Sequence, residues 1–298
     1  MVALLISIFA QVFVLGQAET NRPAAAEPGE GKPAAEAAST NAPPYRMPQV
    51  QILTFPVPLG VPAKTAVLNS KNPMVEYARA AIAVPRGFDR EIATPILLVN
   101  GTSDGDGSSI RAMHAYTNVA LRMGWLVIAA DGPFGKPLND NPPWRWAMIS
   151  SLLEHMNKTW PGSDRWPIAS VGYSGGGKWA GVIGAILAKR GYNLIGVFMG
   201  AVNEDYASEA AKIYDPAVRF KKVPIYLSSG TDDKLATPEQ HTDVRESLLH
   251  HGFSTVRLET FKGGHALAEL ELRKALRWFM EQFGRADAME LEETDSGE

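Results

Sequence analysis

Short apolar runs alternate along the chain with longer stretches in which apolar residues recur at helical spacing. The central runs are continuously apolar, which is typical of strands buried on both faces of a sheet. The runs predict eight strands: QILTFPV (51–57), ARAAIAV (78–84), PILLVNG (95–101), GWLVIAADG (124–132), IASVGYS (168–174), LIGVFMG (194–200), VPIYLSSG (223–230) and TVRLETF (255–261).

The stretches between these runs carry the start and stop residues of helices. Gly124, Gly191 and Gly252 close three of them, and Pro161 stops another. Strands that alternate with helices predict an α/β fold with a mostly parallel eight-stranded sheet. Only turn residues separate the first two strands, which indicates an antiparallel entry to the sheet. The predicted helices are 109–124, 145–160, 177–191, 237–252 and 266–284.

The chain opens on a short apolar segment, residues 1–18, that resembles a secretory signal peptide. Its uninterrupted apolar part is too short for a membrane span, which takes about 20 residues. Gly16 and Ala18 supply the small residues of a cleavage site, although no basic residue precedes the apolar run. We therefore expect export to the periplasm or the medium, with a buried N-terminal helix as the alternative.

The composition divides the rest of the chain into one folded domain between two loose segments. Residues 19–47 are rich in Ala, Pro and Glu, which favours a disordered linker. Residues 285–298 are acidic, which favours a disordered tail. The folded domain is then expected over residues 48–284.

Composition and charge exclude several classes of function. The net charge is −3 over 298 residues, so there is no basic field of the kind that nucleic acid requires. The chain has no cysteine, which excludes disulfides, thiolate catalysis and cysteine-ligated zinc.

The segment GYSGGGKW, residues 172–179, fits two motifs of different function. Gly172, Gly177 and Lys178 match a phosphate-binding P-loop, but that motif needs a hydroxyl after the lysine, and Trp179 stands there. The same segment reads G-x-S-x-G, the nucleophile elbow, in which a sharp strand–helix turn demands small residues two before and two after Ser174. We favour the elbow, and an ordinary glycine-rich turn is the alternative.

The partners of such a serine stand where the elbow motif requires them. The acid is expected after a later strand and the histidine after the last strand. Asp232 and Asp233 follow VPIYLSSG, and His265 follows TVRLETF. The remaining histidines fall in predicted helices or at their ends, where a packed or solvated histidine is the usual case: 114, 155, 241, 250 and 251.

The loop after PILLVNG supplies a fourth part of the same arrangement. Elbow enzymes take one oxyanion donor from the residue after the nucleophile and one from this loop, which in this chain are the backbone N–H groups of Gly175 and Thr102. DGDG at 104–107 suggests a calcium loop, but Ala115 occupies the position of the bidentate glutamate, so we interpret it as a turn and helix cap. The chemistry requires no metal and no organic cofactor.

Taken together, these motifs resemble the α/β-hydrolase superfamily over residues 80–280, with the closest general likeness to small exported esterases of the feruloyl and polyester-hydrolase type. The resemblance implies a serine esterase with Ser174, His265 and an acid. The superfamily's Gly-x-x-Asp pattern, counted from Gly230, selects Asp233. Those esterases often have alanine where this chain has Gly175, and the segments GGKWAG and NPPWRWAM match no subfamily.

The expected substrate is a small-molecule or polymeric carboxylic ester in an open cleft. Only about 22 residues, 201–222, separate the sixth and seventh strands, which leaves no room for a large lid. Tyr173, Trp144 and Trp146 are expected to line the cleft, and the alternative for the tryptophans is a place in the core. A serine peptidase or amidase, or a non-catalytic binding protein with the same fold, remains an alternative function.

Overall fold

The computed structural model describes residues 51–104, 108–134, 136–214 and 219–295, with side chains described as far as Gly284. The chain divides into two units, Met1–Met47 and Pro48–Glu298, and the described strands and helices all belong to the second. The expected signal peptide (1–18) and linker (19–47) lie outside the described residues.

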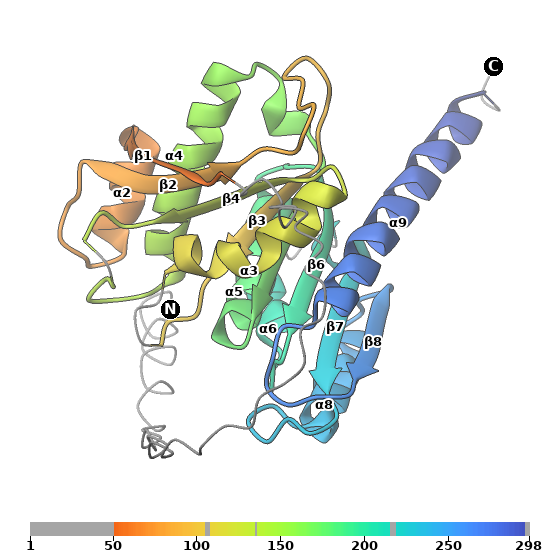
Figure 1. Ribbon diagram of the computed structural model, residues 1–298. Helices are drawn as coiled ribbons and strands as arrows, with labels where there is room; N and C mark the ends of the chain where they lie inside the picture. The colour runs from red at the N-terminus through yellow and green to blue at the C-terminus, as the bar shows by residue number, and fades with distance from the viewer. Residues whose placement is uncertain (1–50, 105–107, 135, 215–218, 296–298) are drawn as a thin grey trace, which may run out of the picture. The chain divides into compact units, whose positions relative to one another are not determined.

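A single sheet of eight strands organises the domain, in the order β1-β2-β4-β3-β5-β6-β7-β8 (Figure 1). β2 runs antiparallel to both of its neighbours, and the other neighbouring pairs are parallel. All eight predicted strands are confirmed, each within a few residues of its expected bounds. They are β1 (Leu53–Pro58), β2 (Tyr77–Ala83), β3 (Ile96–Asn100), β4 (Leu126–Asp131), β5 (Ile168–Tyr173), β6 (Leu194–Gly200), β7 (Ile225–Gly230) and β8 (Val256–Phe261).

Helices cover both faces of the sheet, as expected for an α/β fold. The five predicted helices are α3 (Ser109–Arg122), α4 (Pro142–Thr159), α5 (Gly175–Lys189), α8 (Pro238–His250) and α9 (Glu269–Asp295). Three further helices and one 3₁₀ turn were not predicted: α2 (Val61–Asn69), α6 (Tyr206–Tyr214), α7 (Arg219–Lys222) and Ser163–Arg165.

Two differences from the sequence analysis follow from these bounds. The antiparallel pairing of β1 and β2 is confirmed, but a helix, α2, joins them in place of a simple turn. Among the residues of α2 only Ala63 and Val67 are buried, so its apolar pattern is weak. In place of the loose tail expected over 285–298, the α9 backbone continues to Asp295.

The side chains of each central strand alternate between two hydrophobic cores. In β3, Ile96 and Leu98 face the core under α2, α4, α5 and α8, whereas Leu97 and Val99 face the core under α3 and α9. This burial on both faces explains why the central runs are continuously apolar. It also leaves the loops at the carboxyl ends of the parallel strands as the place where polar side chains converge.

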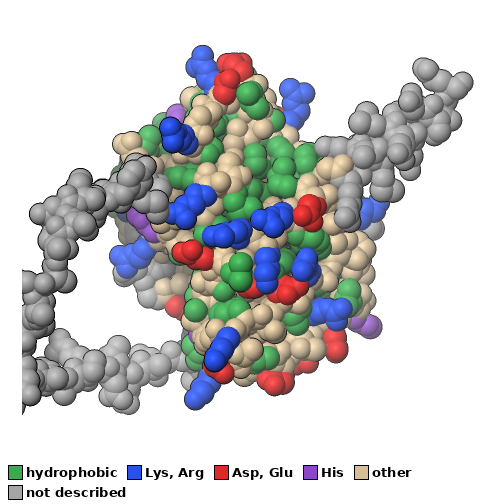
Figure 2. Space-filling view, turned by 45° about the vertical axis from the view of Figure 1, so that its right-hand side comes forward, with side chains coloured by type: hydrophobic (Ala, Val, Ile, Leu, Met, Phe, Trp, Pro, Cys, Tyr) green, Lys and Arg blue, Asp and Glu red, His purple; other side chains and the backbone are tan. Residues whose placement is uncertain are grey.

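In the described part of the connection between β6 and β7 the only helices are α6 and α7, and these residues form no large lid. α6 packs its buried residues Ala207, Ala210 and Ala211 toward α5. In the part of the chain that the structure describes, no helix has the length and apolarity needed to cross a membrane. Acidic and basic side chains both occur over the face shown in Figure 2, in keeping with the near-balanced charge.

Candidate functional site

Ser174 lies at a sharp turn between β5 and α5. Its backbone has φ 55° and ψ −129°, a conformation that costs a non-glycine residue on the order of 1–3 kcal/mol. A β-carbon on Gly172 would overlap the carbonyl of Gly176, and one on Gly176 would overlap the carbonyl of Asn100. The two glycines of G-x-S-x-G are therefore required by the close approach of the backbone, as the motif predicts.

Ser174, His265 and Asp233 form a continuous hydrogen-bonded chain. Nε2 of His265 lies 2.9 Å from the Ser174 hydroxyl, and Nδ1 lies 2.8 Å from Oδ2 of Asp233. Because a carboxylate only accepts, Nδ1 carries a proton toward Asp233, and Nε2 is left to accept the proton of the serine. The three residues come from loops after three different strands, so the fold itself brings them together.

The surroundings of Asp233 hold its carboxylate in place. Burial alone would raise the pKa of Asp233, but hydrogen bonds from the Ala236 N–H, from His265 and from the Leu235 N–H outweigh it and lower the pKa below its usual value. The two backbone donors lie 3.0 and 2.8 Å from Oδ1, which leaves Oδ2 for His265. The neighbouring Asp232 is exposed, and the carboxylate bonded to His265 is that of Asp233.

Backbone hydrogen bonds join the loop of the acid to the loop of the histidine. The N–H of Thr231 donates to the carbonyl of Phe261 at 2.9 Å, and that of Asp232 donates to the carbonyl of Gly263 at 2.8 Å. A β-carbon on Gly230 would overlap the carbonyl of Gly264. The two loops thus extend the pairing of β7 and β8 beyond the ends of the strands and fix the spacing between Asp233 and His265.

Thr102 and Gly175, the expected oxyanion donors, lie against one another. A β-carbon built on Gly175 would overlap the Thr102 hydroxyl and would lie 3.5 Å from the Thr102 α-carbon. The Thr102 hydroxyl is itself 3.2 Å from the Asp104 carboxylate. The loop after β3 therefore packs directly beside the residue that follows Ser174.

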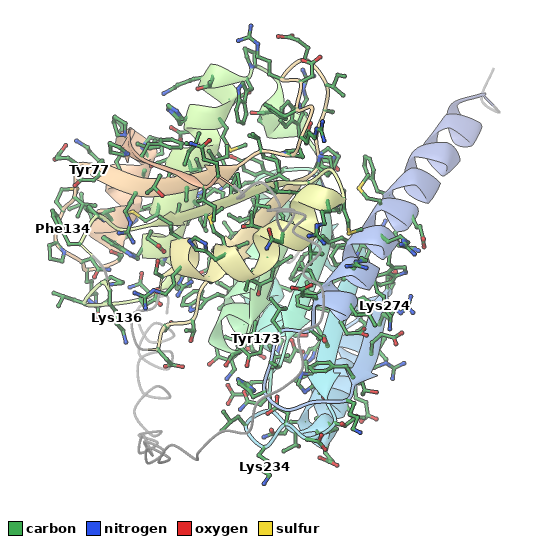
Figure 3. All side chains as sticks on the ribbon, viewed as in Figure 1. Tyr77, Phe134, Lys136, Tyr173, Lys234 and Lys274 are labelled. Carbon is green, nitrogen blue, oxygen red and sulfur yellow. The ribbon has the colours of Figure 1, made fainter. Side chains whose placement is uncertain are left out.

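Tyr173 is the last residue of β5 and lies beside His265 (Figure 3). Lys234, which Figure 3 also labels, lies in the loop after β7. The ring centroids of Tyr173 and His265 are 4.9 Å apart. Burial, and then the charge of Asp233, raise the pKa of Tyr173 to about 12, so its phenol stays neutral.

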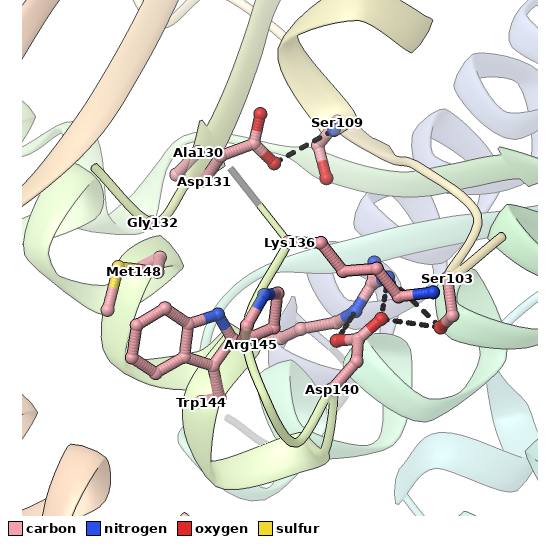
Figure 4. A pocket seen from close by; sticks show the side chains of 11 residues that line it. Ser103, Ser109, Ala130, Asp131, Gly132, Lys136, Asp140, Trp144, Arg145 and Met148 are labelled. Atoms are coloured by element: carbon pink, nitrogen blue, oxygen red, sulfur yellow. Dashed lines mark hydrogen bonds and ion pairs between the residues drawn. The ribbon is translucent and has the colours of Figure 1, made fainter. Parts of the chain in front are cut away.

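The two tryptophans of NPPWRWAM lie in or against the core, the alternative left open by the sequence. Trp144 is 6% exposed, and its ring occupies the space in which Gly132 has no side chain. Trp146 packs edge-on against Tyr192 at 6.2 Å and under the guanidinium of Arg190. Trp144 also lines a small pocket with Ser103, Asp140 and Arg145, residues not singled out from the sequence (Figure 4).

A second histidine, His241, is completely buried next to the site. Its Nε2 accepts a hydrogen bond from the Val202 N–H at 3.0 Å, and its Nδ1 lies 3.2 Å from the Thr237 carbonyl. Burial is the main cause that lowers the pKa of His241, so its imidazole stays neutral. Its two contacts join the residues after β6 to the start of α8. A packed or a solvated helix histidine was expected at this position, and His241 is the packed case.

Among the described residues, no group of three or more His, Asp or Glu side chains is arranged to hold a metal ion. The hydrogen bonds at Ser174 have the geometry that a nucleophile, a base and an orienting carboxylate require.

Comparison with solved structures gives the fold a name. A ferulic acid esterase aligns over 78% of this chain and 99% of its own, at 14% identity and a TM-score of 0.52. A bacterial heroin esterase aligns over 77% of this chain and 84% of its own, at 16% identity and a TM-score of 0.52. A Bacteroides ovatus protein assigned as a dipeptidyl aminopeptidase IV aligns over 78% of this chain but only 36% of its own, at 14% identity and a TM-score of 0.51.

No protein-family model and no curated protein matches the sequence. At these identities the likeness concerns the fold alone. The chain has the α/β-hydrolase fold, as the motifs at Ser174, Asp233 and His265 led us to expect.

Proposed function

We propose that the protein is a serine hydrolase that cleaves carboxylic esters through an acyl-enzyme intermediate. The observation that carries the proposal is the hydrogen-bonded chain from Ser174 through His265 to Asp233, built on a strained turn that leaves the serine partly exposed. The esterase names of two neighbours with the same fold agree with it.

In the proposed acylation step, Oγ of Ser174 attacks the ester carbonyl and His265 Nε2 takes the hydroxyl proton. The tetrahedral intermediate collapses, the carbon–oxygen bond to the alcohol breaks, and His265 returns the proton to the leaving alcohol. Water then enters, gives a proton to His265 and attacks the acyl-enzyme. The acid leaves, and Ser174 recovers its proton.

Asp233 and the oxyanion donors act on the charges that develop in these steps. Asp233 fixes the tautomer of His265 and stabilises its protonated form, which its lowered pKa supports because the carboxylate stays ionised at neutral pH. The N–H groups of Gly175 and Thr102 are assigned to the carbonyl oxygen as it becomes negative. Gly175 begins α5, so the helix dipole adds to the same effect.

The proposed substrate class is supported by the short connection between β6 and β7, whose described residues form no large lid. A cleft without a cap domain accepts bulky or polymeric esters as well as small ones. The phenol of Tyr173, beside His265, is assigned to the wall of this cleft. Esters are preferred over amides in this proposal, and a peptidase on the same fold is the alternative.

Labelling with a fluorophosphonate probe tests the nucleophile. The folded protein should be labelled at Ser174, and both the Ser174→Ala variant and heat-denatured protein should not react. A folded protein that fails to react, or reacts at another residue, would overturn the proposal. Parallel assays on a nitrophenyl ester and an amino-acid anilide then separate the esterase from the peptidase.

A further inference from the structure

A buried ion pair lies directly behind the loop that carries Thr102. Arg145, in the first turn of α4, is 8% exposed. Its Nε and Nη2 donate to the two carboxylate oxygens of Asp140 at 2.7 and 2.6 Å (Figure 4). A buried ion pair is costly to desolvate and is weak evidence for a role in stability. A further hydrogen bond of Arg145, from Nη1, indicates a different role.

Nη1 of Arg145 donates to the carbonyl oxygen of Gly101 at 2.8 Å. This carbonyl belongs to the same peptide unit as the N–H of Thr102, the proposed oxyanion donor. No cis peptide occurs in the described chain, and in a trans peptide the N–H points away from the C=O. A hydrogen bond that fixes the Gly101 carbonyl therefore also fixes the direction of the Thr102 N–H.

The same network reaches the helix that begins after the nucleophile. The Ser103 hydroxyl donates to Asp140 and accepts a hydrogen bond from Nε1 of Trp179 at 2.8 Å. The guanidinium of Arg145 lies 4.2 Å from the ring centroid of Trp179, a cation–π contact. Trp179 lies on α5, five residues after Ser174. The network thus joins α4, the loop after β3 and the nucleophile helix.

We propose that Arg145 is a positioning residue for the oxyanion hole, an inference that rests on the proposed serine hydrolase function. Arg145 holds the Gly101–Thr102 peptide so that the Thr102 N–H meets the developing oxyanion, and its charge polarises that peptide and strengthens the donor. The role needs the planar fork of arginine, because a lysine ammonium cannot hold both oxygens of Asp140 and also reach Gly101.

Steady-state kinetics of Arg145→Met and Arg145→Lys on a nitrophenyl ester test this role. Loss of one oxyanion donor lowers kcat on the order of 10² to 10³, and we expect Arg145→Met to approach that range. Because the donor acts on the transition state, KM should change by less than about threefold. The kcat of Arg145→Lys should lie between those of the wild type and Arg145→Met, at a loss of roughly tenfold. A lysine ammonium can keep either the contact with Asp140 or the contact with Gly101, but not both.

Two further measurements separate positioning from a general loss of structure. Phenylboronic acid forms a tetrahedral adduct with Ser174, whose proton passes to His265, and its inhibition constant should rise by the same factor by which kcat/KM falls. The pH at which kcat/KM is half-maximal should not move, because the hydrogen bonds of Ser174, His265 and Asp233 are untouched.

The matched control is Glu271→Gln on α9. Glu271 is also buried and charged, and it accepts hydrogen bonds from Tyr226 and Lys274 at 2.7 and 2.8 Å. This variant should lower Tm in the way that Arg145→Met does but leave kcat unchanged.

Each outcome decides the inference. Unchanged kcat in folded Arg145→Met, a fall in kcat that the boronate does not follow, or an equal fall in Glu271→Gln would overturn it. If neither Arg145 variant folds while Glu271→Gln does, Arg145 acts on stability and the inference is wrong. A wild-type protein that is inert to esters and to the fluorophosphonate would instead refute the serine hydrolase function itself.

Discussion

The α-carbon of Gly175 faces the side chain of Thr102 so closely that a β-carbon on residue 175 would overlap the threonine hydroxyl. Esterases that resemble this chain often have alanine at this position, and in this protein the side chain of Thr102 would have to move to admit it. The conflict lies between the side chain of Thr102 and residue 175, the two residues whose backbone N–H groups are the proposed oxyanion donors.

We expect Gly175→Ala to lower kcat by at least about tenfold, because the loop of Thr102 must move away from the oxyanion. Thr102→Ala alone should have a small effect, since the backbone N–H remains. The double variant Thr102→Ala/Gly175→Ala should recover most of the activity, because the overlapping hydroxyl is gone. Kinetics on the three variants form a cycle, and a double variant no better than Gly175→Ala would contradict the steric explanation.

The two adjacent aspartates after β7 should differ sharply in their effect on turnover. Asp233→Asn leaves the side-chain shape but favours the wrong histidine tautomer, so kcat should fall on the order of 10⁴. Asp232→Asn is the matched control, and its exposed side chain predicts a loss below about tenfold. Circular dichroism should show both variants folded. The reverse order of effects would assign the acid to Asp232.

The buried His241 predicts how stability depends on pH. Its pKa is lowered in the folded state, so below the unfolded pKa of about 6.5 the unfolded chain binds a proton that the native state does not. Stability due to this group is therefore complete above about pH 6.5 and is lost as pH falls, by up to about 1.4 kcal/mol per pH unit. Urea unfolding of the wild type between pH 7.5 and 5 should show this slope.

The control for this slope is His241→Gln, whose amide can accept from Val202 but does not titrate. The variant should be less stable at pH 7.5, yet its stability should fall less steeply as the pH drops. Equal slopes in the two proteins would assign the acid sensitivity to other groups.

Trp146 should contribute to stability and not to substrate binding. Its ring packs against Tyr192 and Arg190. We expect Trp146→Leu to lower the free energy of unfolding by about 1–3 kcal/mol and to leave KM for bulky esters unchanged. A clear rise in KM for large but not small esters would place the residue at the cleft after all.

The strands and the site residues were predictable because each leaves a local mark on the sequence. A strand buried on both faces needs a continuous apolar run, and β3 to β7 each have one. Ser174 and Asp233 follow such runs, and His265 follows β8, the last strand, in which polar residues interrupt the apolar ones. The carboxyl ends of parallel strands meet at one edge of the sheet. Their approach to hydrogen-bonding distance therefore follows from the topology.

The helix α2 and the contacts of Arg145 were not predicted, because the sequence carries little local signal for them. In α2, Ala63 and Val67 alone are buried, too few to give a helical period. The contacts of Arg145 with Gly101 and with Trp179 cross 44 and 34 positions of the chain, and no spacing rule connects them. One sequence signal was present. Arg145 stands between Trp144 and Trp146, in a segment that directly follows a proline pair, and a charge among large apolar residues suggests a buried ion pair.

The joined loops after β7 and β8 also bear on when the protein gains its activity during synthesis. The ribosome delivers Ser174 first, Asp233 next and His265 only after the last strand has been made. A nascent chain that ends before β8 has a nucleophile and an acid but no base, and its acid loop lacks the backbone partners Phe261 and Gly263. On the proposed function, ester cleavage can begin only once the far edge of the sheet is complete, and chains that end before β8 are expected to be inert toward the esters of the cell that makes them.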